Sequence, residues 1–461
     1  MDRRGASPGS PALRSELSSL LGRRSGALSS LCRMQSASQR ADALCSEVRS
    51  ALSESGVRYV DGELSHYEGG CYVPLRRDAL SMTLSNVLCS LGVGASDVRR
   101  MGDMPLSVLW EAVMESDPRL LVFDDCVLDV GTGRRLAHSP SLPATVRMGY
   151  ALGAGAAGAP GWEAFLSEVM PDAAERACLQ EFLGLCLLDR SALSVEKMAV
   201  FVGGGANGKS VVFDVVKAAL GPGRVGFLSP DQLADPKQAV SLRGKAVNFA
   251  PDVRRGAAFD SALKALASAQ EVQGWKLYEG SVTLRCPPLV FALNEMPAFR
   301  DVTDAFFRRL MVFRFGVTIP PDRQDRALAA RIASGERAGV FLWMLEGARR
   351  LAASGGAFTP CPLMDRDLER VRRSARAAAS PVSRWLERNG LFPEPRGGAG
   401  RHPVRVPASR IHSELRGAVT KTDITREMAS LGVCRLRGSE VVYILYRNEE
   451  SDEDQEKEDK A

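Results

Sequence analysis

The chain has 461 residues, of which 45% are hydrophobic and 25% are charged, as is ordinary for a globular protein. Its longest apolar stretch, 179–202, is interrupted by Asp189 and Arg190, so no run reaches the roughly 20 residues that a membrane span needs. The length suits two or three domains, and a membrane role is not expected.

The net charge of +5 is unevenly distributed along the chain. The last segment, EESDEDQEKEDKA (449–461), holds eight acidic and two basic residues, a net of −6, so the remainder carries +11. This surplus suits a polyanionic partner such as DNA, although it also suits simple solubility. We expect 449–461 to be a disordered acidic tail.

The ten cysteines include no CxxC pair, which favours reduced thiols in a cytoplasmic compartment.

The first third of the chain predicts an arm followed by a folded lobe. Residues 1–55 are rich in Ser, Arg, Ala and Gly, which indicates a disordered or weakly helical arm. Residues 56–160 alternate strand and helix patterns, so we expect an α+β N-terminal lobe. Its only carboxylate cluster is Asp124, Asp125 and Asp129, which a turn explains better than a two-metal polymerase site does. No primase activity is therefore expected.

The segment 161–355 contains a strand, a glycine-rich loop and a helix in that order. KMAVFV is typical of a buried strand, KSVVFDVVKAAL has apolar residues at helical spacing, and GGGANGKS between them satisfies the P-loop pattern. The glycines would bring backbone N–H groups to phosphate oxygens, Lys209 would reach the β/γ-phosphates, and Ser210 would ligate magnesium. A chance match is the competing interpretation. The candidate nucleotide-binding residues are Gly203, Gly205, Asn207, Gly208, Lys209 and Ser210.

Two downstream strands would deliver polar side chains to such a loop. LRGKAVNFAPDV predicts a strand that ends near Asp252, which would hold magnesium or polarise the attacking water. PPLVFALNEMP predicts a buried strand with Asn294 at its carboxyl end, where an amide can orient water against the γ-phosphate. A turn aspartate and a turn-capping asparagine are the alternatives.

Two arginines precede a further apolar strand in DAFFRRLMVFRF. An arginine inserted into a neighbouring subunit's site stabilises charge on the transferred phosphoryl group, and Arg308 and Arg309 are candidates for this role. An exposed pair that makes ordinary ion pairs is the alternative.

The ordered set GGGANGKS, GKAVNFAPDV, LVFALNEMP and FFRRLMVFRF resembles the superfamily 3 helicases, most closely the phage and plasmid primase-helicase family with its poxvirus relatives. The resemblance implies an α/β fold with a P-loop AAA+-like ATPase core that binds ATP and magnesium, assembles as a ring, a hexamer, and translocates along DNA. Under it, Lys209 and Ser210 take the Walker A positions, Asp252 the Walker B acid and Asn294 the sensor of motif C. Arg308 or Arg309 takes the arginine finger.

The same family carries a DNA-contacting hairpin between the Walker B strand and motif C. Here GWKLYEGSVTLRC has turn residues at Glu279 and Gly280 and offers Lys276 and Tyr278 to DNA. A surface lysine beside core aromatics is the alternative. The lone Asp252 behind Pro251 departs from the acidic pair that the family often has.

Residues 356–448 predict a helical linker and a winged-helix-like domain, with an exposed loop at 393–403. The order from residue 406 is helix, helix and a pair of strands. Thr422 or Asp423 would cap the second helix. DNA phosphates would be met by Arg426, Arg435 and Arg437. Because winged helices also bind proteins, contact with other replication proteins is the alternative.

The sequence therefore predicts an ATP-dependent DNA helicase that replicates a phage, plasmid or integrated element in a bacterial or infected-cell cytoplasm. The alternative is an origin-binding or loader-type ATPase that holds DNA or a partner without unwinding.

Overall fold

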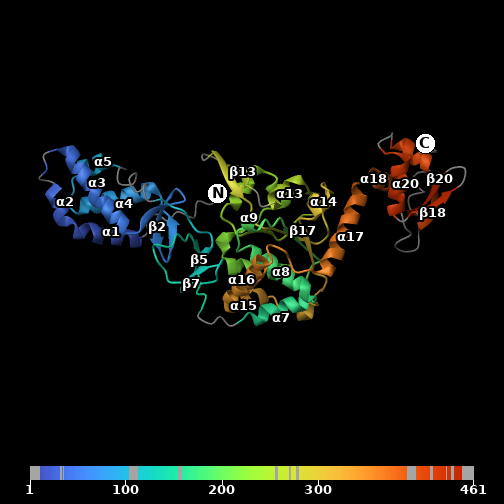
Figure 1. Ribbon diagram of the computed structural model, residues 1–461, viewed down its shortest axis with the longest axis horizontal. Coiled ribbons are helices and arrows are strands. Elements are labelled where there is room, and N and C mark those ends of the chain that lie inside the picture. The colour runs from blue at the N-terminus through green and yellow to red at the C-terminus, as the bar shows by residue number, and fades with distance from the viewer. Residues whose placement is uncertain are drawn as a thin grey trace.

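The structure is a computed structural model that describes the greater part of the chain's residues. They are 11–31, 34, 36–102, 113–153, 158–254, 258–268, 271–276, 280–391, 401–415, 419–431, 433–437 and 441–448. The molecule is elongated, with a helical N-terminal end, a central α/β body and a small C-terminal domain joined to the body by one long helix (Figure 1). Within these residues no helix is both long and apolar enough to cross a bilayer. The predicted acidic tail lies outside them.

Three helices occupy the region predicted to be an arm. They are α1 (Pro11–Arg23), α2 (Ser25–Leu31) and α3 (Ala37–Glu54), followed later by α4 (Arg77–Ser90) and α5 (Ala95–Met101). Leucines such as Leu13, Leu17 and Leu20 recur at helical spacing in α1 and are buried in a core shared with α3 and α4. Of the two alternatives predicted for this region, the described residues therefore show the helical one, because the apolar spacing outweighs a composition rich in Ser and Arg.

The N-terminal lobe adds two small four-stranded sheets. The first has the order β3-β2-β1-β4, with β1 (Val57–Val60), β2 (Glu63–Glu68), β3 (Cys71–Pro74) and β4 (Val113–Met114). The second has the order β7-β6-β5-β8, with β5 (Leu120–Val122), β6 (Val127–Asp129), β7 (Arg135–Leu136) and β8 (Val146–Arg147). The Asp129 carboxylate accepts hydrogen bonds from the backbone N–H of Gly131 and from the Thr132 hydroxyl, which assigns it to the turn after β6.

The central body is built on a five-stranded sheet whose strands are all parallel. Its order is β10-β11-β15-β9-β17, with β9 (Met198–Val202), β10 (Val225–Gly226), β11 (Val247–Ala250), β15 (Leu289–Leu293) and β17 (Leu310–Arg314). Side chains of β9 alternate between two cores: Ala199 and Phe201 join one, and Met198 and Val200 join the other. The sheet is thus buried on both faces, as parallel sheets generally are.

Helices cover both faces of this sheet. One face packs against α7 (Pro160–Val169), α8 (Ala173–Leu185), α10 (Lys209–Leu220), α15 (Leu328–Gly335) and α16 (Arg337–Ala353). The other packs against α11 (Pro230–Leu233), α12 (Pro236–Ala239), α13 (Ser261–Ala267), α14 (Asp304–Phe307) and α17 (Pro362–Ala379). Smaller elements are α9 (Arg190–Leu193), the parallel pair β12 (Ala258–Phe259) and β16 (Ala298–Phe299), and the antiparallel pair β13 (Glu271–Lys276) and β14 (Gly280–Arg285).

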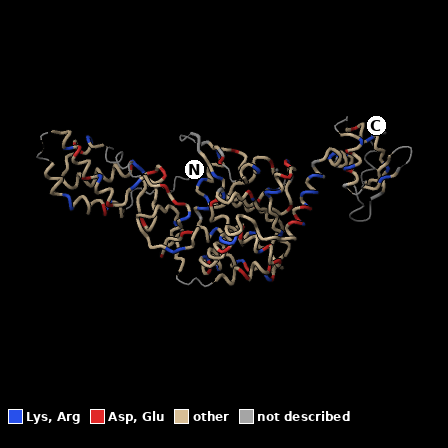
Figure 2. Tube along the Cα trace, in the orientation of Figure 1, with Lys and Arg blue, Asp and Glu red and all other residues tan. Residues whose placement is uncertain are grey.

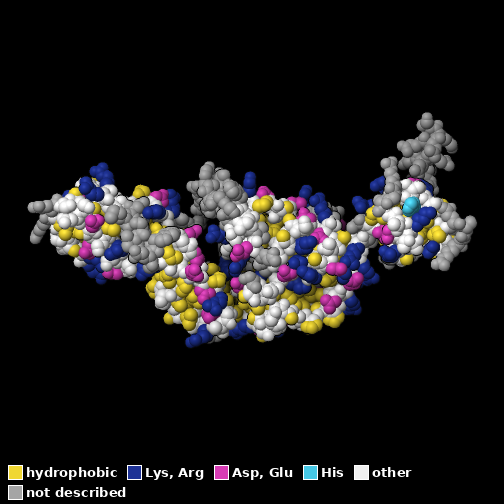
Figure 3. Space-filling model, turned by 45° about the horizontal axis from the view of Figure 1, so that its top comes forward, with side chains coloured by type: hydrophobic (Ala, Val, Ile, Leu, Met, Phe, Trp, Pro, Cys, Tyr) yellow, Lys and Arg dark blue, Asp and Glu magenta, His cyan; other side chains and the backbone are white. Residues whose placement is uncertain are grey.

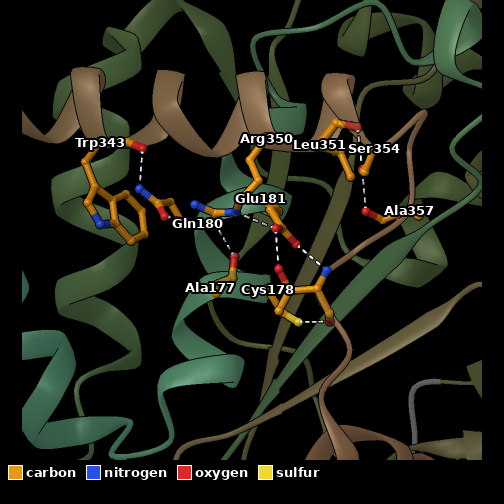
Figure 4. Close-up of polar contacts among 10 residues, drawn as sticks. Ala177, Cys178, Gln180, Glu181, Trp343, Arg350, Leu351, Ser354 and Ala357 are labelled. Carbon is orange, nitrogen blue, oxygen red and sulfur yellow. Dashed lines mark hydrogen bonds and ion pairs between the residues drawn. The ribbon is translucent and has the colours of Figure 1, made fainter.

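A buried carboxylate fastens α8 to α16 (Figure 4). The Arg350 Nε of α16 donates to Glu181 Oε1 of α8 over 2.7 Å, and the backbone N–H of Thr359 donates to Glu181 Oε2 over 2.8 Å. The carboxylate is therefore satisfied from two directions, as a buried charge requires.

The long helix α17 leads from the body to the C-terminal domain. Its acidic side chains lie in the half nearer the body and only arginines follow them toward the C-terminal domain (Figure 2). Arg372 and Arg376 both pair with Asp304 of α14. Lys and Arg side chains gather where α17 leaves the body (Figure 3). The helix is held to the body by this contact and by Val371 and Ala375 in the core.

The C-terminal domain packs its helices against a three-stranded antiparallel sheet of order β18-β20-β19. Its elements are α18 (Pro381–Arg388), β18 (Arg401–Pro407), α19 (Ala408–Glu414), α20 (Lys421–Ser430), β19 (Cys434–Arg437) and β20 (Val441–Asn448). Two predictions are corrected. The exposed loop at 393–403 ends early, because Arg401–Pro403 belong to β18, while 392–400 lie outside the described residues. The cap of α20 is Thr420, whose side chain and that of Asp423 bond each other's backbone N–H.

Candidate functional site

The loop between β9 and α10 lies at the carboxyl edge of the parallel sheet. Gly205 and Gly208 have φ values of +107° and +89°, in the left-handed region that favours glycine. A Cβ at Gly203 would lie 2.3 Å from the Phe315 carbonyl oxygen, and one at Gly208 would lie 2.8 Å from the Phe165 ring. Close contacts therefore require glycine at 203, and both close contacts and backbone conformation require it at 208.

Lys209 begins α10, and its ammonium lies inside the loop. The residue is only 9% exposed, and its Nζ donates to the Gly203 carbonyl and to Asn207 Oδ1, the latter over 3.0 Å. The Asn207 amide is held in turn by donating to the Phe315 carbonyl over 3.1 Å. Burial lowers the pKa of Lys209, and within the described residues no carboxylate forms an ion pair with it. A desolvated cation of this kind is a natural partner for an anion.

Asp252 and Asn294 reach the same edge of the sheet from neighbouring strands. The backbone N–H of Gly203 donates to the Leu293 carbonyl over 3.1 Å, so Asn294 follows directly beside the loop. The Val253 N–H donates to the Ala292 carbonyl over 3.2 Å, so Asp252 lies next to the end of β15. Both side chains are exposed, as is Ser210 in the first turn of α10. The fold thus brings Ser210, Asp252 and Asn294 to one edge of the sheet. Because β15 lies between β11 and β9, the strands that lead to Asp252 and to the loop are about 10 Å apart.

A buried carboxyl group at this edge had no sequence signal. Glu175 in α8 is 3% exposed, and its Oε1 accepts a hydrogen bond from the Arg314 N–H at the end of β17 over 3.0 Å. Burial raises the pKa of Glu175 to about 7. Glutamate in the first turn of a helix is ordinary, so nothing in the sequence distinguished this one from an exposed residue.

Arg308 and Arg309 lie at the opposite edge of the sheet. Because Leu310 of β17 pairs with Met198 of β9, both arginines flank the amino end of β9. The five residues of β9 separate them from the loop by about 17 Å of strand. Arg309 is 8% exposed and pairs with Glu196 over 2.7 Å, whereas the Arg308 side chain is 66% exposed and lies 3.7 Å from the same carboxylate. The two candidates therefore differ: Arg309 is a buried ion-pair member, and Arg308 points to solvent.

The predicted hairpin is a pair of antiparallel strands, β13 and β14. Lys276 pairs with Gly280 at the end of the ladder. Tyr278 lies outside the described residues. Contact of these residues with DNA stays a prediction.

The predicted basic residues of the C-terminal domain do not form one group. Arg435 lines a cavity of about 500 Å³ together with Lys421, Thr422 and Thr425 of α20. Arg426 is exposed, lies 3.5 Å from Asp423 and is not among the residues that line this cavity. Arg437 ends β19. Lys421 was missed by the sequence interpretation, and its position in the first turn of α20 is the signal that could have found it.

Magnesium would find few protein ligands in this chain. Within the part of the chain that the structure describes, no group of three or more His, Cys, Asp or Glu side chains could hold a metal ion. Ser210 and Asp252 fit an ion that takes most of its ligands from phosphates and water, as magnesium often does.

The fold and this edge define a mixed α/β protein with a parallel sheet, in which a glycine-rich loop precedes a helix. No family model matches the chain, and no curated protein matches it either. A solved structure titled the A form apo structure of NrS-1 C terminal region is similar with a TM-score of 0.43 at 9% identity, covering 87% of this chain and 98% of that one. Two further structures of the NrS-1 C terminal region give TM-scores of 0.41 and 0.40, each at 10% identity, covering 86% of this chain and 98% and 97% of theirs. At these values the similarity carries no argument about function.

Proposed function

We propose that this chain is an ATP-dependent DNA helicase of the superfamily 3 type, a ring ATPase that translocates along DNA during replication of a phage, plasmid or integrated element. The observation that carries the proposal is Lys209. Its ammonium is buried in a glycine-rich loop at the carboxyl end of β9, and among the described residues its hydrogen-bond partners are carbonyl oxygens alone. Phosphate groups at a helix N-terminus are the ligands that such a loop suits best.

The neighbouring residues supply the remaining chemistry that ATP hydrolysis needs. Lys209 would exchange its bonds to Gly203 and Asn207 for bonds to phosphate oxygens. Ser210 and Asp252 would hold magnesium, which neutralises charge on the phosphates. Asn294, beside the loop, would orient the attacking water. This carboxyl edge is where open α/β sheets bind their ligands.

Arg308 supports the ring. Its side chain is exposed at the amino end of β9, on the edge opposite to Lys209, so it cannot serve the loop of its own chain. An exposed arginine there can enter the nucleotide site of a neighbouring subunit, where it would stabilise the transferred phosphoryl group. This role requires a neighbouring subunit, and we propose that the subunits form a ring, a hexamer.

DNA would contact the β13–β14 pair at Lys276 and the basic cavity of the C-terminal domain, and the charge surplus outside the acidic tail would attract DNA to the molecule. Tyr278, the other contact predicted in this segment, lies outside the described residues. Lys421 and Arg435 meet around this cavity from two separate elements, α20 and β19. Two cations beside threonine hydroxyls are suited to a phosphate of the backbone.

The deciding experiment measures ATP hydrolysis and strand displacement on a forked duplex for the wild type, Lys209→Ala and Lys217→Ala. Lys217 lies two turns further along α10, over the rings of Phe213 and Phe227, and is the matched control. We expect Lys209→Ala to lose both activities, by about 10²–10³-fold in hydrolysis, because it removes a charge that acts in the transition state. Lys217→Ala should keep both.

Other outcomes separate the alternatives. Hydrolysis that DNA stimulates without strand displacement would favour a loader or origin-binding ATPase. A wild type that binds no nucleotide would overturn the proposal in both forms.

A further inference from the structure

One buried arginine, Arg190, occupies the junction between α8 and the central sheet. It begins α9 and is 5% exposed. Its guanidinium donates to four backbone carbonyls and to no carboxylate within the described residues. The acceptors are Cys286 at 3.2 Å, Ala267 at 2.6 Å, Lys197 at 3.4 Å, and Val195 at 3.3 Å from Nη2 and 3.4 Å from Nε.

These four carbonyls come from three segments that are far apart in sequence. Ala267 ends α13, shortly before β13 begins at Glu271, and Cys286 directly follows the last residue of β14. Val195 and Lys197 lead into β9. One side chain therefore joins both ends of the β13–β14 pair to the start of the strand that carries the glycine-rich loop.

The β13–β14 pair needs such an anchor, because an isolated pair of strands is at best marginally stable. The pair is also held by Leu284 of β14, which is buried in the core on this face of the sheet. In addition, β13 packs closely on the 3-10 turn Val240–Leu242, where a Cβ at Gly274 would lie 2.0 Å from Val240 Cγ2. At the base, Arg285 of β14 also lies 3.6 Å from Asp189, the residue before Arg190. The base of the pair is thus held by two adjacent residues, Asp189 and Arg190.

The chemistry of arginine suits this position better than that of other side chains. A guanidinium has five donors in a rigid planar fork, whereas lysine has a single point of attachment and glutamine has two donors. Burial lowers the pKa of Arg190, and a buried cation is costly unless its hydrogen bonds are satisfied. Here the hydrogen bonds to the four carbonyls offset that cost.

The segment that Arg190 holds also contacts the arginine pair. Lys197 Nζ donates to the Arg308 carbonyl over 2.6 Å, and Glu196 pairs with Arg309 over 2.7 Å. Residues 195–197 therefore touch the base of the β13–β14 pair through Arg190 and the start of β17 through their own side chains.

We propose that Arg190 is a positioning residue that fixes the β13–β14 pair to the amino end of β9 and so couples DNA contact to ATP hydrolysis. The inference rests on the proposed function, because it takes the β13–β14 pair to be the element that contacts DNA. Arg190 itself touches neither DNA nor nucleotide. It holds the β13–β14 pair in a fixed position relative to the edge of the central sheet that carries Arg308.

The test compares the full-length wild type with Arg190→Lys, and Arg350→Lys is the matched control. Arg350 is partly buried and, like Arg190, donates a hydrogen bond to a backbone carbonyl, that of Ala177. It serves as a control because it joins α8 to α16, away from the β13–β14 pair. We expect Arg190→Lys to bind nucleotide as the wild type does and to lose DNA stimulation of hydrolysis by about 10-fold, within the usual 5–150-fold range of coupling. Amide hydrogen exchange in β13 and β14 should accelerate in Arg190→Lys and not in Arg350→Lys.

A second measurement needs no variant. Native-state exchange of the wild type in increasing urea should show the amides of β13, β14 and residues 195–197 opening as one cooperative unit. Independent opening of the strand pair would overturn the proposal, and so would an Arg190→Lys protein that keeps full DNA stimulation. A wild type that neither binds nucleotide nor responds to DNA would instead contradict the proposed function, while the urea result would still decide whether Arg190 anchors the pair.

Discussion

The two ends of β9 carry two different kinds of site. At its carboxyl end, the loop 203–208 and Lys209 follow one another directly along the chain. At its amino end, Glu196 pairs with Arg309, which lies 113 residues further along the chain. At the same end, Arg190 donates hydrogen bonds to the carbonyls of Ala267 and Cys286. The first site is local in sequence, and the second exists only once the sheet has formed.

This difference shows which functional residues can be identified from the sequence and which cannot. A local motif predicts both the ligand and the residues that bind it, because the chain itself sets their spacing. For a site that is assembled across strands, the sequence predicts only candidate residues. Burial and ion pairing in the folded protein decide which of these residues can reach a ligand. Arg308 and Arg309 are adjacent in sequence, yet one is exposed and the other is buried.

The largest expected effect separates these two arginines. Arg308→Ala should slow ATP hydrolysis by about 10³-fold or more, because an arginine finger contributes 10³–10⁵ where it is used. Its thermal stability should hardly change, since the side chain is exposed. Arg309→Ala should instead lower the free energy of unfolding by about 1–3 kcal/mol, because Glu196 loses its nearest partner. Phosphate release and thermal unfolding measure the two effects, and the reverse pattern would exchange the assignments.

The second expected effect is a pH dependence of stability, and it tests the burial of Glu175 at the carboxyl edge of the sheet. The pKa of Glu175 is about 7 in the folded chain and 4.5 ordinarily, so the folded state holds this proton at pH values where the unfolded state has lost it. Stability from this group therefore falls as pH rises from about 4.5 to about 7, by about 3 kcal/mol. Glu175→Gln keeps the acceptor for the Arg314 N–H and carries no charge.

We accordingly expect Glu175→Gln to be more stable than the wild type at pH 8 and nearly equal to it at pH 4.5, as thermal unfolding at the two pH values would measure. Glu163→Gln, on the exposed face of α7, is the control and should show no such difference. Equal stabilities of Glu175→Gln and the wild type at pH 8 would show that the carboxyl group is not buried as described.

A third and smaller effect compares two adjacent glycines of the loop. A Cβ at Gly203 would lie 2.1 Å from the Asn207 amide nitrogen, whereas one at Gly204 has nothing within 4 Å. Gly203→Ala should therefore destabilise the protein by about 1–3 kcal/mol through overpacking, and Gly204→Ala should not. The midpoint of urea unfolding distinguishes them. Equal midpoints would mean that the loop relaxes easily and is not held by Asn207.

The smallest effect concerns DNA and the cavity of the C-terminal domain. Lys421→Ala and Arg435→Ala should each reduce the slope of log K against log salt by about 1, because each removes one phosphate contact. Arg426→Ala should reduce it less, since that guanidinium lies 3.5 Å from Asp423. DNA affinity measured at several salt concentrations provides the slopes. A larger change for Arg426 than for Lys421 would place the contact on the other face of α20.

Several elements could be predicted from sequence because each has a strong local pattern. The strands ending near Asp252 and at Leu293 and the helix that starts at Lys209 are all present. The β13–β14 pair, which the family resemblance implied, is present as well. Composition left the N-terminal region open between disorder and weak helix, and the spacing of its leucines is the signal that favours the helices observed. β18 was missed because its residues alternate with prolines and follow a glycine-rich stretch.

The sequence by itself determined the glycine-rich loop, the lysine that follows it and the strands that end near Asp252 and Asn294, because these depend on short-range spacing and hydrophobic periodicity. Only the tertiary structure decided that Glu175 and Arg190 are buried, that Arg308 rather than Arg309 is exposed, and that Lys421 joins Arg435. Burial and ion pairing depend on which segments meet across the sheet, and that information is distributed over the whole chain.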